Sequence, residues 1–373
     1  MAKTNCIMRL VFGILPIFLA HGVYASFRDF GLPASTSTVD VRVFNVANAT
    51  VVNASQAFLL PVLPGHESTT FTAHSFLVEH TKSHKRLIVA GLITSGLFHF
   101  ELDKDIPELL QDGGITLSSI DAVIWSHSHF DHIGDMSKFP NTTGLVIGSA
   151  TDTSTYPEFA NASLQASDFA DHKITKLDFA NASLTFSGLK AVDYFGDGSF
   201  YLLDTPGHMS GHLTALARVT PSSFIVLGGD SFHHAGEVRP RPQFQKNFPC
   251  PAHLLEEATT SISTDYFWSP RSRDRKFDVI SRAQPLLRLS DLPDSFYADP
   301  VKAEVSLDKL ASFDADPDFF VVAAHDLSLR SSLPYFPASL SGWKASRLKE
   351  KAVWNFIDKA NPSFALSPTN GTQ

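Results

Sequence analysis

Short apolar segments recur along the chain between polar turns, and several of them alternate apolar with polar residues. Alternation with a period of two predicts a half-buried strand, and a continuous apolar run bounded by turn residues predicts a buried strand. The pattern predicts hairpins where the polar turns TKSHK and TPSS separate two such segments. Strands are expected over residues 39–46, 75–79, 87–92, 122–126, 145–148, 183–186, 199–203, 212–219, 224–227 and 319–324.

Helical segments are predicted between these strands, over residues 106–111, 253–264 and 348–359. Strands and helices interleave along the whole chain, which is typical of an α/β or α+β fold with more than one sheet. No stretch rich in Pro, Gly and Ser divides the chain after its first residues. We therefore expect one domain over residues 26–373.

The first 25 residues differ from the rest. Lys3 and Arg9 provide positive charge, residues 10–20 are an apolar run, and residues 23–25 (VYA) place small residues before a cleavage point. This layout predicts a signal peptide over residues 1–25, and the apolar run is too short to span a bilayer. An uncleaved anchor is the alternative. The mature protein is therefore expected to be secreted.

Acceptor sequences for N-linked glycans support the same expectation. The pattern N-x-S/T occurs at Asn48, Asn53, Asn141, Asn161, Asn181 and Asn370. Several such sites behind a signal peptide predict an exported glycoprotein with these asparagines on its surface. The chain has two cysteines, Cys6 and Cys250, and removal of the leader would leave no internal disulfide.

The amino-acid composition limits the classes of partner that the protein is expected to bind. With 373 residues and 43% hydrophobic content, the chain can bury a large core. The formal charge is −8, and no basic cluster occurs. Nucleic acid and a stable polybasic membrane contact are therefore not expected as partners.

Four predicted strands end in residues that can bind a metal. HSHFDH follows the strand at 122–126, TPGHMSGH follows 199–203, GGD follows 224–227, and HD follows 319–324. If these strands lie side by side, the four phrases share one edge of the fold. The gathering of His and Asp at such an edge predicts a metal centre.

Spacing within HSHFDH has a physical meaning. Residues two apart on an extended backbone point the same way, so His127 and His129 can bind one cation. A turn after Phe130 would bring Asp131 and His132 to a point nearby. Zinc favours such a mixture of imidazole and carboxylate ligands.

The order HSHFDH, TPGHMSGH, GGD and AAHD resembles the metallo-β-lactamase superfamily, and specifically its binuclear zinc hydrolases. The gap of 22 residues between His208 and Asp230 is similar to that of the lactonase-like branch. The leader and the phrase GGDSFHHAGEVRP resemble secreted fungal members. The resemblance implies a four-layer αββα sandwich with a core of about residues 36–330, and an insertion over about residues 236–312 that covers the pocket.

The resemblance also implies a ligand set for two zinc ions. It assigns His127, His129 and His208 to the first metal, Asp131, His132 and His325 to the second, and Asp230 to both. His212 is given a structural role in this pattern.

Two positions depart from the family pattern. Val89 stands where many relatives have an aspartate behind the site, and His233 stands where the lactonase branch has a tyrosine that assists the substrate carbonyl. His233 or the adjacent His234 is expected to supply that contact. Apolar residues of the insertion are expected to contact an apolar part of the substrate, namely Phe244, Leu254, Leu255, Phe267 and Trp268.

The resulting hypothesis is a secreted zinc hydrolase that cleaves an ester or lactone carbonyl of a small molecule. A hydroxide shared by the two metals would attack, with Asp131 and His233 as catalytic residues. A β-lactamase or thioesterase using the same site is the first alternative. An iron-binding oxidoreductase of the same superfamily and a binding protein with an inactive site are the others.

Overall fold

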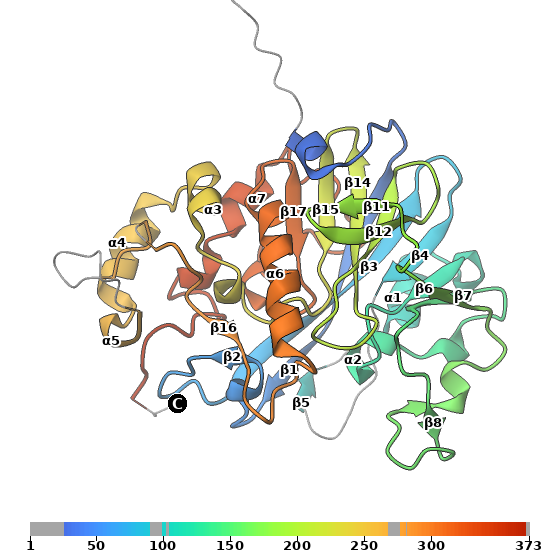
Figure 1. Ribbon diagram of the computed structural model, residues 1–373, viewed down its shortest axis with the longest axis horizontal. Helices are drawn as coiled ribbons and strands as arrows, with labels where there is room; N and C mark the ends of the chain where they lie inside the picture. Colours follow the sequence, from blue (N-terminus) through green and yellow to red (C-terminus); the bar gives the residue numbers. More distant parts are fainter. Residues whose placement is uncertain (1–25, 90–98, 102–103, 268–276, 281, 371–373) are drawn as a thin grey trace, which may run out of the picture.

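The structure, a computed structural model, describes residues 26–89, 99–101, 104–267, 277–280 and 282–370, and the predicted leader lies outside them. Two sheets face each other, and helices lie on their outer sides (Figure 1). Among the described residues, no helix combines the length and apolar character that a membrane span needs.

The first sheet has seven strands in the order β10-β7-β6-β4-β3-β1-β5. Strands β5, β1, β3 and β4 are antiparallel, whereas β4, β6, β7 and β10 run parallel. The antiparallel pairing of β3 with β4 confirms the first predicted hairpin. The bounds are β1 Val39–Val51, β3 Thr69–His80, β4 Arg86–Val89, β5 His99–Glu101, β6 Ala122–Ile124, β7 Gly144–Gly148 and β10 Ile174–Leu177.

The second sheet has six strands in the order β11-β12-β13-β14-β15-β17. The pairing of β14 with β15 confirms the second predicted hairpin. Since β13 and β15 both run antiparallel to β14, and β17 is parallel to β15, the carboxyl ends of β13, β15 and β17 lie at one edge. The bounds are β11 Leu184–Phe186, β12 Leu189–Asp193, β13 Phe200–Asp204, β14 Leu213–Thr220, β15 Ser223–Leu227 and β17 Phe319–Val322.

Period-two alternation sorts the strand residues into layers. On β13, Phe200 and Leu202 enter the core between the sheets, whereas Tyr201 and Leu203 enter a second core on the outer face. The outer face of the first sheet has its own core, built with Ile106 and residues near it. Three apolar layers separated by two sheets confirm the predicted αββα sandwich.

Helices complete the outer layers. Helix α1 (Ile106–Asp112) covers the first sheet together with the short α2 (Phe130–Ile133), and α6 (Pro300–Asp314) covers the second. The remaining helices are α3 Pro242–Asn247, α4 Ala252–Ser261, α5 Thr264–Phe267 and α7 Leu348–Ala352. The predicted helices at 106–111 and 253–264 correspond to α1 and α4. The one at 348–359 is divided into α7 and a 3-10 helix over Asn355–Ile357.

Small elements fill the connections. Two-stranded pairs join β2 (Leu59–Leu60) to β16 (Arg288–Leu289) and β8 (Thr155–Tyr156) to β9 (Leu164–Gln165). Other 3-10 helices cover Ser26–Phe30, Ser55–Ala57, Leu117–Ser119, Met136–Lys138, Ala166–Asp168, Ala235–Glu237 and Leu327–Leu329.

Helix α6 was not predicted, although its local signals are clear in retrospect. The Asp299 side chain accepts a hydrogen bond from the Lys302 amide at the amino end, and Pro300 occupies the first turn. Ala303, Leu307 and Leu310 then bury one face against the second sheet. Its apolar stripe is narrow, and charged residues interrupt it.

A buried ion pair joins this helix to the chain segment that follows the 3-10 helix over Ala235–Glu237. The Arg239 guanidinium donates two hydrogen bonds to the Asp314 carboxylate, at 2.7 and 2.8 Å, and a third to the Val353 carbonyl. Burial opposes ionisation of Asp314, but Arg239 holds the pKa of that carboxyl below its usual range. The pair therefore links α6 with the C-terminal segment.

Replacing Arg239 with Met should lower the free energy of unfolding by about 3–5 kcal/mol, because the Asp314 carboxylate is then buried without a partner. Urea denaturation measures this loss. In the control Arg241→Met, the partner Asp308 is 54% exposed, so the loss should be only about 0–1 kcal/mol. Equal losses in the two variants would contradict a buried role for Arg239.

Candidate metal centre

The loop after β6 brings four side chains of HSHFDH together. His129 is the N-cap of α2, so the chain turns there and directs Asp131 and His132 back toward the strand ends. The Nε2 atom of His127 lies 2.9 Å from Nδ1 of His129. The sharp turn expected after Phe130 is thus provided by a single helical turn.

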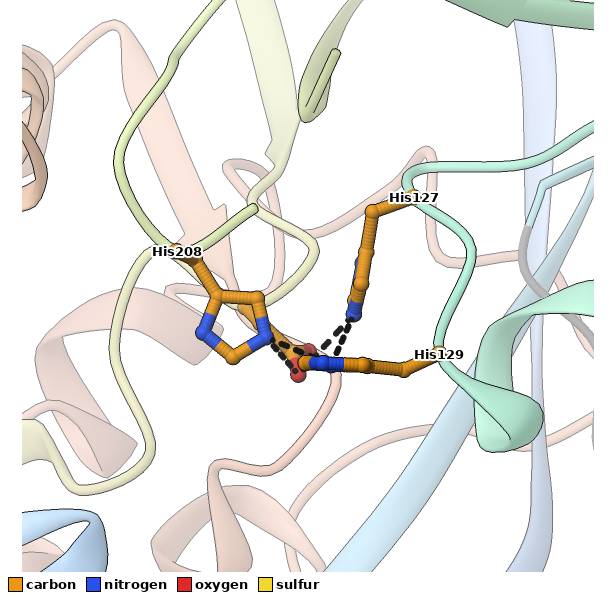
Figure 2. A group of neighbouring side chains, drawn as sticks. His127, His129 and His208 are labelled. Atoms are coloured by element: carbon orange, nitrogen blue, oxygen red, sulfur yellow. Dashed lines mark hydrogen bonds and ion pairs between the residues drawn. The ribbon is translucent and has the colours of Figure 1, made fainter. Parts of the chain in front are cut away.

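Three further side chains come from the second sheet. His208 follows β13, Asp230 follows β15 and His325 follows β17, all at the edge where these strands end. The Nε2 atom of His208 lies 3.0 Å from Nδ1 of His129. Figure 2 shows His127, His129 and His208 pointing toward one another.

Asp230 lies at the centre, and each of its carboxylate oxygens faces a different group of histidines. Oδ2 lies 3.2 Å from Nε2 of His208 and 3.6 Å from Nε2 of His127. Oδ1 lies 2.9 Å from Nε2 of His132 and 3.3 Å from Nε2 of His325. The carboxylate is 2% exposed, so almost no water reaches it. Asp230 therefore lies between the two groups of histidines.

The second group is completed by Asp131. Its Oδ2 lies 3.2 Å from Nε2 of His325 and 3.7 Å from Nε2 of His132. The structure therefore brings all seven predicted ligands into two adjacent clusters. One contains His127, His129, His208 and Asp230, and the other contains Asp131, His132 and His325. His233 also lies close enough to Asp230 and His325 to form a third group that could hold a metal.

This donor set fits two metal cations. The Nε2 atoms of His132 and His325 are 3.2 Å apart, a close approach for two imidazole nitrogens unless a proton or a cation lies between them. Oδ1 of Asp230 is buried and accepts no hydrogen bond of good geometry among the described residues, although Nε2 of His132 lies 2.9 Å away. Such an uncompensated acceptor is costly in a protein interior, and a cation would compensate it.

Burial and charge also prepare the side chains for ligation. Burial lowers the pKa of His129 to about 3 and that of His208 to about 4, so both imidazoles are neutral at physiological pH. Burial opposes ionisation of Asp230, but His132, His325 and the other histidines hold its pKa well below the usual range. For His325, Asp230 and Asp131 outweigh burial and raise the pKa.

Backbone and side-chain contacts behind the clusters fix the orientations of the rings. Nδ1 of His325 lies 2.8 Å from the Thr72 carbonyl, and Nδ1 of His132 lies 2.9 Å from the Ser126 hydroxyl. Such contacts select which imidazole nitrogen faces a metal. At Val89, the position where the resemblance implied an acid, the side chain packs in the core between the sheets.

His212 lies outside both clusters, as the resemblance implied. Its Nε2 accepts a hydrogen bond from the Asp230 amide at 3.0 Å, and its Nδ1 contacts Thr205. Gly229 makes this approach possible, because its φ is +53° and a Cβ there would lie 2.8 Å from Nε2 of His212. His212 therefore positions the backbone of Asp230.

The two histidines after Asp230 have different roles. Nε2 of His233 faces the clusters, 3.4 Å from Oδ2 of Asp230. His234 turns away, since its Nε2 contacts the Ser363 carbonyl and its Nδ1 accepts from the Gly236 amide. Of the two candidates, His233 is the one that reaches the site.

A pocket opens beside the clusters, and its apolar wall is mostly aromatic. The wall residues are Ala49, Phe58, Phe71, Phe130 and Phe296; the polar lining consists of His129, Asp131, His208, Asp230, His233 and His325. Phe58 and Phe296 stack on each other, with ring centroids 4.5 Å apart. Sequence reasoning did not identify these walls.

The expected wall residues lie elsewhere. Phe244, Leu254 and Phe267 are buried in the core beside the C-terminal segment, Leu255 packs against that core, and none of them lines the pocket. Trp268 falls outside the described residues. Of the predicted insertion over residues 236–312, the residue that lines the pocket is Phe296. The physical reason is that α3, α4 and α5 bury their apolar faces in the core instead.

Residues 69–325 match the family model described as the metallo-beta-lactamase superfamily. The γ-lactamase FDB1 of Fusarium pseudograminearum (strain CS3096) is 31% identical over 89% of this chain and 84% of that protein. The metallo-hydrolase mfmC of Annulohypoxylon moriforme is 31% identical over 90% of each chain. A crystal structure of an N-acyl homoserine lactone lactonase shares the fold, with a TM-score of 0.52 and 15% identity over 82% of this chain and 100% of that one.

Replacing Asp230 with Ala should reduce the metal content of both clusters, because one oxygen of this carboxylate faces each of them. Elemental analysis of the purified variant measures the result. The control Asp204→Asn changes a half-buried carboxyl at the end of β13, the strand that precedes His208, and this carboxyl lies outside both clusters. Two metal equivalents retained in the Ala variant would contradict the bridging role.

Proposed function

Because the chain belongs to the metallo-beta-lactamase superfamily, we propose that it is a secreted zinc hydrolase that opens the ring of a small lactone. The chain is a metal-dependent hydrolase similar to lactonases and γ-lactamases. The observation that carries the proposal is the bridging geometry of Asp230 next to an aromatic pocket.

Different side chains of this site would bind the substrate and orient it. Phe58, Phe71 and Phe296 exclude water and favour an apolar body of small size. Nε2 of His233 faces the same space, where it is placed to contact the carbonyl oxygen of a bound substrate. Two divalent cations held by the seven ligands would supply carbonyl polarisation and activation of water.

Asp131 is the residue placed to move a proton. Burial opposes ionisation of this carboxyl, but His132 and His325 lower its pKa to about 2, so it is ionised at neutral pH. An ionised carboxylate at the pocket wall can accept a proton during attack and transfer it to the leaving oxygen. The role in ring opening that we propose for Asp131 is therefore that of a proton carrier.

Zinc is the metal that this donor set favours. The clusters contain imidazoles and carboxylates with no thiolate, and their histidines include His129 at a position where iron-binding relatives have a carboxylate. Metal analysis of the purified protein separates the alternatives. Two zinc equivalents per chain are expected, whereas one iron and no zinc would support the oxidoreductase instead.

A γ-lactam is the second candidate substrate, because a relative of nearly full coverage bears the name γ-lactamase. The leaving group of a lactam is an amine, which must be protonated as it departs, whereas a lactone releases an alkoxide. Both reactions use the same pocket and the same carboxylate at Asp131. Lactones and γ-lactams of matched ring size therefore belong in the same assay.

A substrate panel tests the lactone assignment. The zinc-loaded protein should give its highest kcat/KM with a lactone, ahead of γ-lactams, aryl esters, thioesters, β-lactams and phosphotriesters. The chelator-treated protein, with and without added zinc, is the control. The assignment fails if a β-lactam or thioester exceeds every lactone and ester tenfold, about 1.4 kcal/mol of transition-state preference.

Secretion is the remaining part of the proposal, and the exposure of the acceptor asparagines supports it. Five of them are exposed and lie outside the strands of the two sheets, namely Asn53, Asn141, Asn161, Asn181 and Asn370. Asn48 differs because it lies within β1, paired to Thr72 on one side and to Glu101 on the other. Its side-chain oxygen is buried. A glycan is difficult to accommodate there.

Expression in a eukaryotic host should yield secreted, glycosidase-sensitive protein that begins near Ser26. Each Asn→Gln change at an exposed site that carries a glycan should increase gel mobility by one glycan, whereas Asn48→Gln should leave mobility unchanged. Mass spectrometry of the glycopeptides checks the assignment. An intracellular protein without glycans would contradict secretion.

A further inference from the structure

A short segment before α6 connects both sides of the pocket. The Phe296 amide donates to the Ala57 carbonyl at 2.9 Å, which fixes the segment to one wall. The Ala298 amide donates to the His208 carbonyl at 3.0 Å, and the Asp299 amide to the Gly207 carbonyl at 2.9 Å. Residues 296–299, which we call the strap, are therefore fixed both to the aromatic wall and to the loop of a candidate metal ligand.

Tyr297 of the strap is buried against two histidines. Its ring meets His208 edge to face at 5.2 Å and His233 at 5.4 Å, and the residue is 2% exposed. Its hydroxyl lies 2.7 Å from Nδ1 of His233. Burial raises the pKa of Tyr297 well above its usual value, so the phenol keeps its proton.

The ring of His233 packs between aromatic neighbours and lines the pocket. It stacks on His325 at 5.2 Å with an interplanar angle of 8°, and Phe58 lies 4.9 Å away. The backbone amide of His233 donates to Glu237 at 2.7 Å. A ring held in this way cannot exchange the positions of its two nitrogens without moving its neighbours, so its tautomer decides what it offers to the pocket.

Two contacts select the same tautomer. Nδ1 lies within hydrogen-bond distance of the Tyr297 hydroxyl, and a hydroxyl proton donated to Nδ1 leaves the ring proton on Nε2. At the other end, Nε2 lies 3.4 Å from the ionised Asp230 carboxylate, which would repel a lone pair there and attracts an N–H group. Both ends of the ring therefore favour a proton on Nε2.

We propose that Tyr297 is a positioning residue that holds His233 with its proton on Nε2, so that His233 gives the pocket a hydrogen-bond donor and is not an additional metal ligand. The donor would stabilise the developing negative charge on the carbonyl oxygen of the substrate. This inference rests on the proposed hydrolysis for its substrate, and on geometry alone for the tautomer.

The variant Tyr297→Phe removes one oxygen atom and keeps the ring. In the zinc-loaded protein, kcat for the preferred lactone should fall about 10- to 100-fold, less than is typical for the loss of an oxyanion donor itself. KM and the metal content should stay within about threefold of the wild-type values, because the ligands and the walls are unchanged. Unaltered kcat would overturn the proposal.

The control is Tyr201→Phe, which removes the same atom from another buried tyrosine. Tyr201 lies in the core on the outer face of the second sheet, away from the pocket. The loss in kcat should occur in Tyr297→Phe alone. Equal losses of kcat in both would show that Tyr297 has a merely structural role.

Nitrogen-15 NMR of the histidine side chains tests the tautomer without a substrate. In the zinc-loaded wild type, His233, assigned by comparison with His233→Gln, should carry its proton on Nε2, and Tyr297→Phe should shift it partly to Nδ1. A wild-type His233 with no proton on Nε2 would overturn the proposal. If the protein hydrolyses no lactone, the proposed function fails. The NMR comparison of the wild type with Tyr297→Phe still tests whether Tyr297 positions His233.

Discussion

The buried carboxylate of Asp230 is the constraint on which the rest of the site depends. A negative charge that is 2% exposed is costly unless opposite charge surrounds it, and here imidazole nitrogens face both of its oxygens. Those nitrogens come from both sheets, so the sandwich must close before the charge is compensated. The Leu213 amide donates to the Ser126 carbonyl at 2.7 Å and joins the two sheets beside the site. Folding and assembly of the site are therefore one event.

The local part of the site could be predicted from the sequence. HSHFDH carries its geometry within six residues, and a strand before it and a glycine after it leave few other conformations. His208, Asp230 and His325 were also predictable, because each follows an apolar strand whose direction the topology rules constrain. The structure places all of them together. The hairpins were predictable for the same reason, since alternation and turn residues are local signals.

The other parts of the site depend on tertiary packing, which the spacing of residues along the sequence does not encode. The pocket wall combines Phe58, Phe71 and Phe296, which are far apart in the chain and belong to no motif. Phe244 and Phe267 have the same chemistry, yet they pack in the core. Strand β10 was missed because its side chains are mostly exposed, so its sequence lacks the apolar alternation on which the prediction relied. Aromatic composition alone cannot distinguish a wall from a core.

The strap places two aromatic residues next to each other in the chain with different tasks. Phe296 forms part of the pocket wall, whereas Tyr297 contacts His233 behind it. Side-chain changes at position 296 can therefore reshape the substrate space while the neighbouring hydroxyl stays in place. A deletion or insertion of one residue would instead exchange the two side chains and disturb both tasks. Substrate range in this architecture can thus diversify by substitution more readily than by changes in the length of the strap.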